Sequence, residues 1–196
     1  MKKSTIISLS AIGLIAVLVL WGMSTYNSLV TLREDVTSQW ANVESQYQRR
    51  SDLIPNLVAT VKGYATHESS TLEGVVAARA KATQVTIDPK NLTPEKLQEY
   101  QAAQGQVSSA LGKLLMITEN YPDLKANQNF LELQAQLEGT ENRISVERSR
   151  YNYVAKLYNV PVQKMPRAII ASFFGFKEKP YFEAEKGTEK APAVKF

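Results

Sequence analysis

The amino-acid sequence predicts an all-α protein in which an N-terminal transmembrane helix continues into an antiparallel four-helix bundle of long helices. An uncharged apolar segment stands near the N-terminus, and four later segments carry apolar residues at spacings of three and four. No alternating strand pattern occurs apart from the short residues 85–87. The 196 residues leave about 150 for one bundle domain after an anchor and a tail.

The N-terminal segment predicts a membrane anchor over residues 1–25. Residues 4–32 contain no charged side chain, and the apolar centre at residues 6–23 has 18 residues. A helix of that length can cross the hydrocarbon core of a bilayer at about 1.5 Å per residue. The anchor residues expected to face lipid are Ile6, Leu14, Val17, Leu20, Trp21 and Met23.

A cleaved signal peptide is the competing interpretation of this segment. Lys2 and Lys3 form a basic start, and residues 22–24 could serve as a cleavage site. The apolar run exceeds a typical signal core, and Trp21 suits the membrane interface, so a retained anchor is favoured. The two lysines predict a cytoplasmic N-terminus in the cytoplasmic (inner) membrane and an exported bundle, since only Arg33 follows closely.

The predicted bundle covers residues 26–160. Because proline is absent before Pro55, the anchor and the first bundle helix are expected to form one rod over residues 4–50. A second helix is expected from Pro55 to Gln84, and a third begins at the capping sequence Thr93-Pro94-Glu95. After a break at residues 121–123, a fourth helix is expected from residue 130 to Asn159 because Pro161 follows.

Residues 161–182 are predicted to be a short apolar segment that folds back and caps the bundle. The alternative is a docking segment for a partner or for the membrane surface. Its candidate docking residues are Ile169, Ile170, Phe173, Phe174 and Phe176. Residues 183–196 are rich in lysine, glutamate, glycine and proline, which predicts a disordered tail.

The composition excludes most catalytic chemistry. The chain lacks cysteine, and its single histidine, His67, has no second histidine at zincin spacing. No nucleophile elbow, phosphate loop or dinucleotide fingerprint occurs. The net charge of +4 is spread along the chain and forms no basic stripe for nucleic acid. We therefore expect no enzyme activity, cofactor, metal or nucleic-acid partner.

Polar residues fall in phase with the apolar stripes of two helices. Counting seven residues from Val43 reaches Arg50, and counting seven from Thr140 reaches Glu147. These observations predict a buried or half-buried ionic layer that fixes helix register. Its expected members are Arg50, Asp52, Glu141, Arg143 and Glu147. A ligand site built on the same layer is the functional alternative.

Several motifs between Tyr26 and Ala184 resemble those of the LemA family. They are Tyr26-Asn27-x-Leu29-Val30, Gln48-Arg49-Arg50-x-Asp52-Leu53-Ile54-Pro55-Asn56-Leu57-Val58, Val61-Lys62-Gly63-Tyr64-Ala65-x-His67-Glu68, Asn129-Phe130-Leu131, Leu137-Glu138-Gly139-Thr140-Glu141-Asn142-Arg143-Ile144, Arg150-Tyr151-Asn152 and Phe174-Gly175-Phe176. The resemblance implies one membrane helix, a long helical bundle and an unsettled molecular function, with a magnetosome branch that suggests membrane organisation. It carries over no catalytic residue, and it has been associated with an external N-terminus, opposite to the charge pattern.

These observations favour a membrane-anchored interaction or scaffold protein of the cell envelope. Its expected partners are the membrane and either another protein or a second copy of itself. The alternatives are an envelope enzyme or accessory subunit that uses buried carboxylates, and a bundle that binds a ligand or lipid.

Overall fold

The computed structural model describes residues 3–183, without the side chains of residues 3–6 and 8. The helices are α1 (Lys3–Lys62), α2 (Ser69–Gln84), the 3₁₀ turn η1 (Pro89–Asn91), α3 (Pro94–Thr118), α4 (Pro122–Lys125), α5 (Gln128–Gln163) and α6 (Arg167–Phe173). No strand occurs within residues 3–183. The predicted all-α fold with a long N-terminal helix is confirmed. Residues 184–196, most of the predicted tail, lie outside the described residues.

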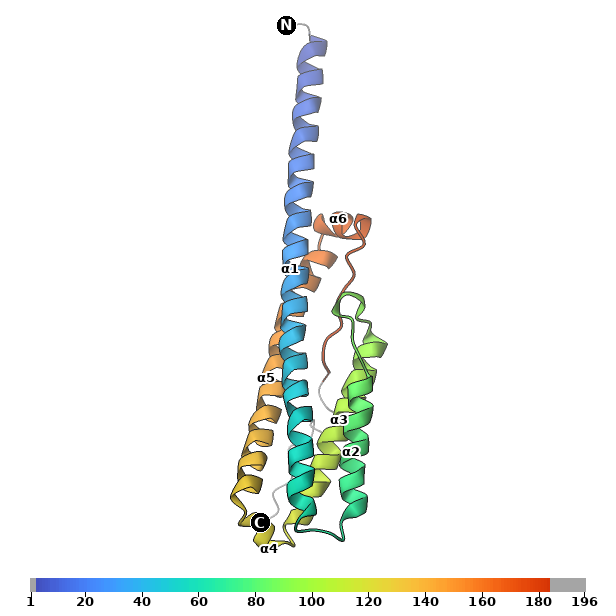
Figure 1. Ribbon diagram of the computed structural model, residues 1–196. Coiled ribbons are helices and arrows are strands. Elements are labelled where there is room, and N and C mark those ends of the chain that lie inside the picture. The colour runs from blue at the N-terminus through green and yellow to red at the C-terminus, as the bar shows by residue number, and fades with distance from the viewer. Residues whose placement is uncertain (1–2, 184–196) are drawn as a thin grey trace, which may run out of the picture.

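The four long helices α1, α2, α3 and α5 run antiparallel to their neighbours in sequence (Figure 1). Contacts of α1 with α5 and of α2 with α3 dominate the packing. Contacts between α1 and α2 connect the two pairs. The α2–α3 pair lies beside only the end of α1 that is distant from the N-terminus (Figure 1). Helix α1 is therefore the central element.

Helix α1 has 60 residues, which correspond to about 90 Å. Its N-terminal part stands clear of the other helices (Figure 1). Leu14, Val17, Leu20 and Met23 are each more than half exposed there, and Trp21 is 37% exposed. By length and composition this part of α1 can cross a membrane. The anchor residue Ile6 lies outside the described side chains.

The buried side chains form two apolar clusters along the bundle axis. The upper cluster, on the anchor side, centres on Trp40, Tyr100 and Tyr151. The lower cluster includes Leu57, Leu111 and Phe130. Each cluster takes residues from α1, α3 and α5 at helical spacing, so amphipathic faces produce both.

The predicted start of a second helix at Pro55 is wrong, because α1 continues through this proline to Lys62. Pro55 has no N–H group for the carbonyl of Ser51, four residues earlier. Arg79 of α2 supplies the missing donor, with 2.8 Å between its Nε and the Ser51 oxygen. The substitute donor allows the helix to continue, and α2 is accordingly only 16 residues long.

The expected end of the last long helix at Asn159 is also wrong, since α5 includes Pro161 and ends at Gln163. Tyr158 and Asn159 are buried, and this packing holds the turn that precedes the proline. The capping prediction for α3 is correct: Thr93 Oγ1 accepts a hydrogen bond from the Lys96 N–H at 3.3 Å.

The donor from Arg79 can be tested by a double-mutant cycle. Arg79→Met should lower the free energy of unfolding by about 1–2 kcal/mol, because the Ser51 carbonyl loses its partner. Pro55→Ala restores the N–H in the helix, so Arg79→Met should cost less in that background. Urea unfolding in mild detergent, followed by circular dichroism, measures both values. Equal costs in the two backgrounds would contradict the assignment.

Candidate interaction groove

A groove separates α3 from α5, which have almost no direct contact with each other in the described part of the chain. The upper half of this groove is filled by residues 177–183, which we call the C-terminal strap. The strap has no helical or strand structure and descends from α6 beside α1 (Figure 1). The groove is therefore a site that already holds one extended segment.

Two asparagines of α5 bind the main chain of the strap. Asn159 accepts from the N–H of Lys179 and donates to its carbonyl, each at 2.8 Å. Asn152 makes the same pair with Phe182, at 2.8 and 2.9 Å. Seven residues of helix rise about 10.5 Å and three extended residues span about 10 Å, so the two spacings match. The helix thus recognises an extended backbone at regular intervals.

The two residues held by these asparagines also bury their side chains. Lys179 Nζ donates to the carbonyls of Pro89 and Lys90 in η1 at 2.6 and 2.9 Å, and burial lowers the pKa of its ammonium group. Phe182 stacks on Trp40 with ring centroids 5.8 Å apart and meets the Tyr151 ring edge to face at 5.2 Å. The strap therefore ties η1 and the aromatic core to α5.

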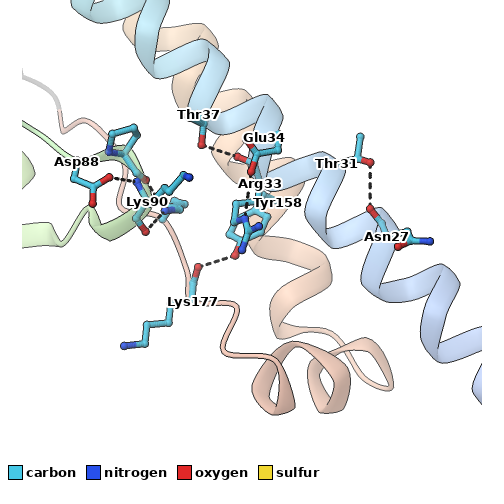
Figure 2. Close-up of polar contacts among 11 residues, drawn as sticks. Asn27, Thr31, Arg33, Glu34, Thr37, Asp88, Lys90, Tyr158 and Lys177 are labelled. Carbon is cyan, nitrogen blue, oxygen red and sulfur yellow. Dashed lines mark hydrogen bonds and ion pairs between the residues drawn. The ribbon is translucent and has the colours of Figure 1, made fainter.

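Both ends of the strap are fixed through carbonyl groups. At its start, Tyr158 donates its hydroxyl to the Lys177 carbonyl at 3.0 Å (Figure 2). At its end, the Glu183 carbonyl accepts from Gln101 of α3 at 3.2 Å and from Arg148 of α5 at 2.9 Å. Glu183 thereby bridges the two walls of the groove.

Beyond Glu183 the described residues of the groove line a cavity of about 410 Å³. Polar side chains and small residues line it, with Arg50 and Tyr47 of α1 among them. The lining residues used below are Gln101, Ala102 and Gly105 of α3 and Glu141, Ile144 and Arg148 of α5. The open half offers donors of the same kind that hold the strap.

The polar layer lies at this level of the groove, between the two apolar clusters. Arg50 is 1% exposed, and its Nη1 donates to Glu141 at 2.6 Å and to Ser108 at 2.7 Å. Its Nη2 donates to the carbonyl and the side-chain oxygen of Gln104 at 3.1 and 2.6 Å. Four acceptors on α3 and α5 thus surround one guanidinium group from α1.

The structure does not bring the five predicted layer residues together. Only Arg50 and Glu141 meet. Asp52 is exposed and accepts from Gln48 within α1, and Arg143 is exposed on α5. Glu147 is half-buried higher along α5, where Gln39 donates to it at 2.7 Å. Asp52 and Arg143 point elsewhere because each lies two residues from Arg50 or Glu141, and a step of two residues turns a side chain by about 200°.

The five predicted docking residues lie in or just after α6 and divide between two faces. Ile169, Phe173 and Phe174 are more than half exposed, whereas Ile170 is half-buried and Phe176 is buried. Gly175 has φ of 71°, and the N–H of Phe176 donates to the Ala171 carbonyl at 2.9 Å. This left-handed glycine closes α6 and turns the chain into the strap.

No group of three or more His, Cys, Asp or Glu that could hold a metal occurs within the described residues. His67 is exposed in the turn between α1 and α2. The carboxylate beside the buried guanidinium, Glu141, is neutralised by Arg50 at 2.6 Å.

The strap was missed by sequence reasoning. The signal that could have revealed it is the pair Asn152 and Asn159, which are seven residues apart on the inward side of a regular helix. Buried asparagine needs hydrogen-bond partners, and its amide matches one N–H and one carbonyl of an extended chain.

Adjacent aromatic residues of the strap provide a matched test. Phe182→Ala should lower the free energy of unfolding by about 3–5 kcal/mol, because a buried ring is lost from the Trp40 stack. Tyr181 is 43% exposed, so Tyr181→Ala should change the value by less than about 1 kcal/mol. Urea unfolding in detergent, followed by tryptophan fluorescence, compares the two. Equal effects would show that the stack does not stabilise the bundle.

Comparison with known proteins places this architecture in a family. The chain is 30% identical over 203 residues to magnetosome protein MamQ 2 of Paramagnetospirillum magneticum, covering 95% of this chain and 73% of that protein. It is 28% identical over 186 residues to magnetosome protein MamQ of Magnetospirillum gryphiswaldense, covering 86% and 68%. It is 24% identical over 133 residues to protein LemA of Metamycoplasma hominis, covering 68% and 57%. Together with a LemA family model that matches residues 39–196, these relatives show that the chain is a membrane-associated member of the LemA family.

Proposed function

We propose that this LemA-type protein is a membrane-anchored interaction or scaffold protein whose α3–α5 groove binds an extended segment of a partner protein. The observation that carries the proposal is the groove itself, which holds the strap through main-chain hydrogen bonds from Asn152 and Asn159. Main-chain recognition suits an extended peptide, and neighbouring pockets add selectivity.

The open half of the groove supports the same use. Gln101 and Arg148 stand at its upper end and donate to a carbonyl there, and Ile144 offers an apolar surface below them. A partner segment that enters beside Glu183 would meet polar donors along α3. A binding role also agrees with the pairing of Glu141 with Arg50 at the wall of the cavity.

The proposal keeps a four-part division of the chain. Residues 1–25 would form the anchor, 26–160 the bundle, 161–182 the capping segment and 183–196 the tail, whose first residue, Glu183, also ends the strap. Because α1 runs without a break from anchor to bundle, the bundle would follow the direction of the membrane span.

Photo-crosslinking in intact cells tests the groove. A photoreactive amino acid at the exposed, groove-lining Ala102 should form adducts with a second protein chain. Val146 lies on α5 outside the set of groove-lining residues and is 48% exposed, so it serves as the control position. Adducts confined to residues 184–196 of the same chain would contradict the proposal, because the groove would then be covered by its own tail.

A bulky side chain inside the groove, compared with one outside it, tests whether the adducts depend on the groove. Gly105 and Gly74 are both exposed, and a Cβ added at either position would meet no atom within 4 Å. Gly105 lines the groove and Gly74 does not. Gly105→Trp should abolish the Ala102 adducts, and Gly74→Trp should leave them unchanged.

The orientation in the membrane is a separate part of the proposal. Lys2 and Lys3 before the span favour a cytoplasmic N-terminus, and the bundle would then lie on the outer side of the cytoplasmic membrane. Asn91 is exposed in η1, and the chain has no cysteine of its own. Asn91→Cys should therefore react with a membrane-impermeant maleimide in intact spheroplasts, with the cysteine-free parent as control. Labelling only after lysis would show that the bundle lies in the cytoplasm and would contradict this orientation.

A further inference from the structure

We propose that α6 is a membrane-interface helix, which inserts Ile169 and Phe173, together with Met165 of the preceding turn, into the lipid surface beside the anchor. The proposal rests on α1 crossing the membrane and is independent of what binds the groove. The partner of this face is the bilayer itself, at the boundary between headgroups and acyl chains.

The position of α6 along α1 is the first argument. Ile170 Cδ1 lies 3.8 Å from the point that a Cβ on Gly22 would occupy, so α6 touches α1 at the end of the exposed apolar segment. Tyr26 then meets the Phe174 ring at 4.7 Å and the Phe176 ring at 5.6 Å. Figure 1 shows α6 as the part of the bundle closest to the free end of α1. If residues 6–23 cross the hydrocarbon core, α6 stands at the bilayer surface.

The direction of the apolar face is the second argument. Ile169 and Phe173 are 57% and 81% exposed, and their spacing of four residues within α6 places them on one side. Met165, in the turn that precedes α6, is 71% exposed. Ala171, on the opposite side, is 1% exposed against the bundle. The packing side of α6 is thus already satisfied. On the outward side, Phe173 meets the neighbouring Phe174 ring edge to face at 5.0 Å, and both rings stay more than half exposed. Contiguous exposed apolar groups of this kind mark interaction surfaces.

Charge is the third argument. Lys164, Arg167 and Lys177 are exposed around the helix, and no acidic residue occurs between positions 164 and 177. Helices that lie in the membrane interface combine an apolar face with basic flanks, which attract anionic headgroups. A protein partner would not account for the coincidence between the height of α6 and the end of the anchor.

Attachment to the membrane through both α1 and α6 would restrict how the bundle moves. A single span can rotate and tilt, whereas a second contact beside it restricts both motions. Since α6 leads into the strap through Gly175, the position of the membrane surface would be transmitted to the groove walls. The orientation of the bundle would then depend on the lipid surface.

Spin labelling of the full-length chain tests the depth of α6. The absence of cysteine allows single labels at Phe173→Cys, at Met116→Cys and at Leu14→Cys. Met116 is 74% exposed near the far end of α3, and Leu14 is 62% exposed in the span, so they report water and lipid. The protein is reconstituted in vesicles of phosphatidylcholine and phosphatidylglycerol, and collision rates with oxygen and with a water-soluble nickel chelate are measured.

We expect the label at Phe173→Cys to have collision rates like those of the label in the span. Its ratio of oxygen to nickel collisions should exceed that of Met116→Cys several-fold and approach that of Leu14→Cys. A label at position 173 that matches Met116→Cys would overturn the proposal, while the groove adducts of Ala102 could still appear. A label that is immobile and shielded from both agents would overturn it as well, because a protein would then cover α6. Folding of each variant is checked by circular dichroism.

Discussion

The structure depends on one helix whose N-terminal part suits lipid and whose remainder packs in a bundle surrounded by water. The N-terminal part of α1 exposes apolar side chains on all sides, as a lipid environment requires, whereas residues 29–61 bury only one face in the bundle. No break in the helix separates these parts. The orientation of the core residues is therefore continuous with that of the anchor, and α2, α3 and α5 assemble on a helix whose direction is set at the membrane.

The buried guanidinium of Arg50 is the second constraint. Moving a charge out of water is costly, and the cost is offset only when several acceptors surround it. Ser108, Glu141 and both oxygens of Gln104 provide that environment from two different helices. Sliding α3 or α5 by one turn would remove some of these acceptors, so the apolar clusters above and below keep their relative register.

Much of this architecture could be predicted from residues whose neighbouring sequence indicates the local structure. The run of uncharged residues indicates the anchor, Thr93 and Pro94 indicate the start of α3, and heptad counting places Arg50 in the core. The same counting does not extend to Asp52 or Arg143, because each is two residues from a layer member and points about 200° away. Glu147 shares the stripe of Thr140 but lies about 10.5 Å higher.

Other features depend on contacts between distant segments and leave little local signal. In the sequence, Pro55 looks like the first turn of a new helix. The helix nevertheless continues, because Arg79 from α2 donates a hydrogen bond to the Ser51 carbonyl. The strap has no helical periodicity, and its asparagine partners recognise backbone atoms that every sequence possesses. Composition predicts the docking segment as a set of apolar residues, whereas its division into two faces depends on the turn at Gly175 and on the packing of Ala171.

The position of the strap has a consequence for biosynthesis. Chains are made from the N-terminus, so α1, α3 and α5 leave the ribosome before the strap does. Until residues 177–183 arrive, Trp40 and Tyr151 lack the ring of Phe182, and Asn152 and Asn159 lack their main-chain partners. A nascent or prematurely terminated chain would expose aromatic and amide groups that the finished protein hides, and quality-control proteases could distinguish the two by that difference.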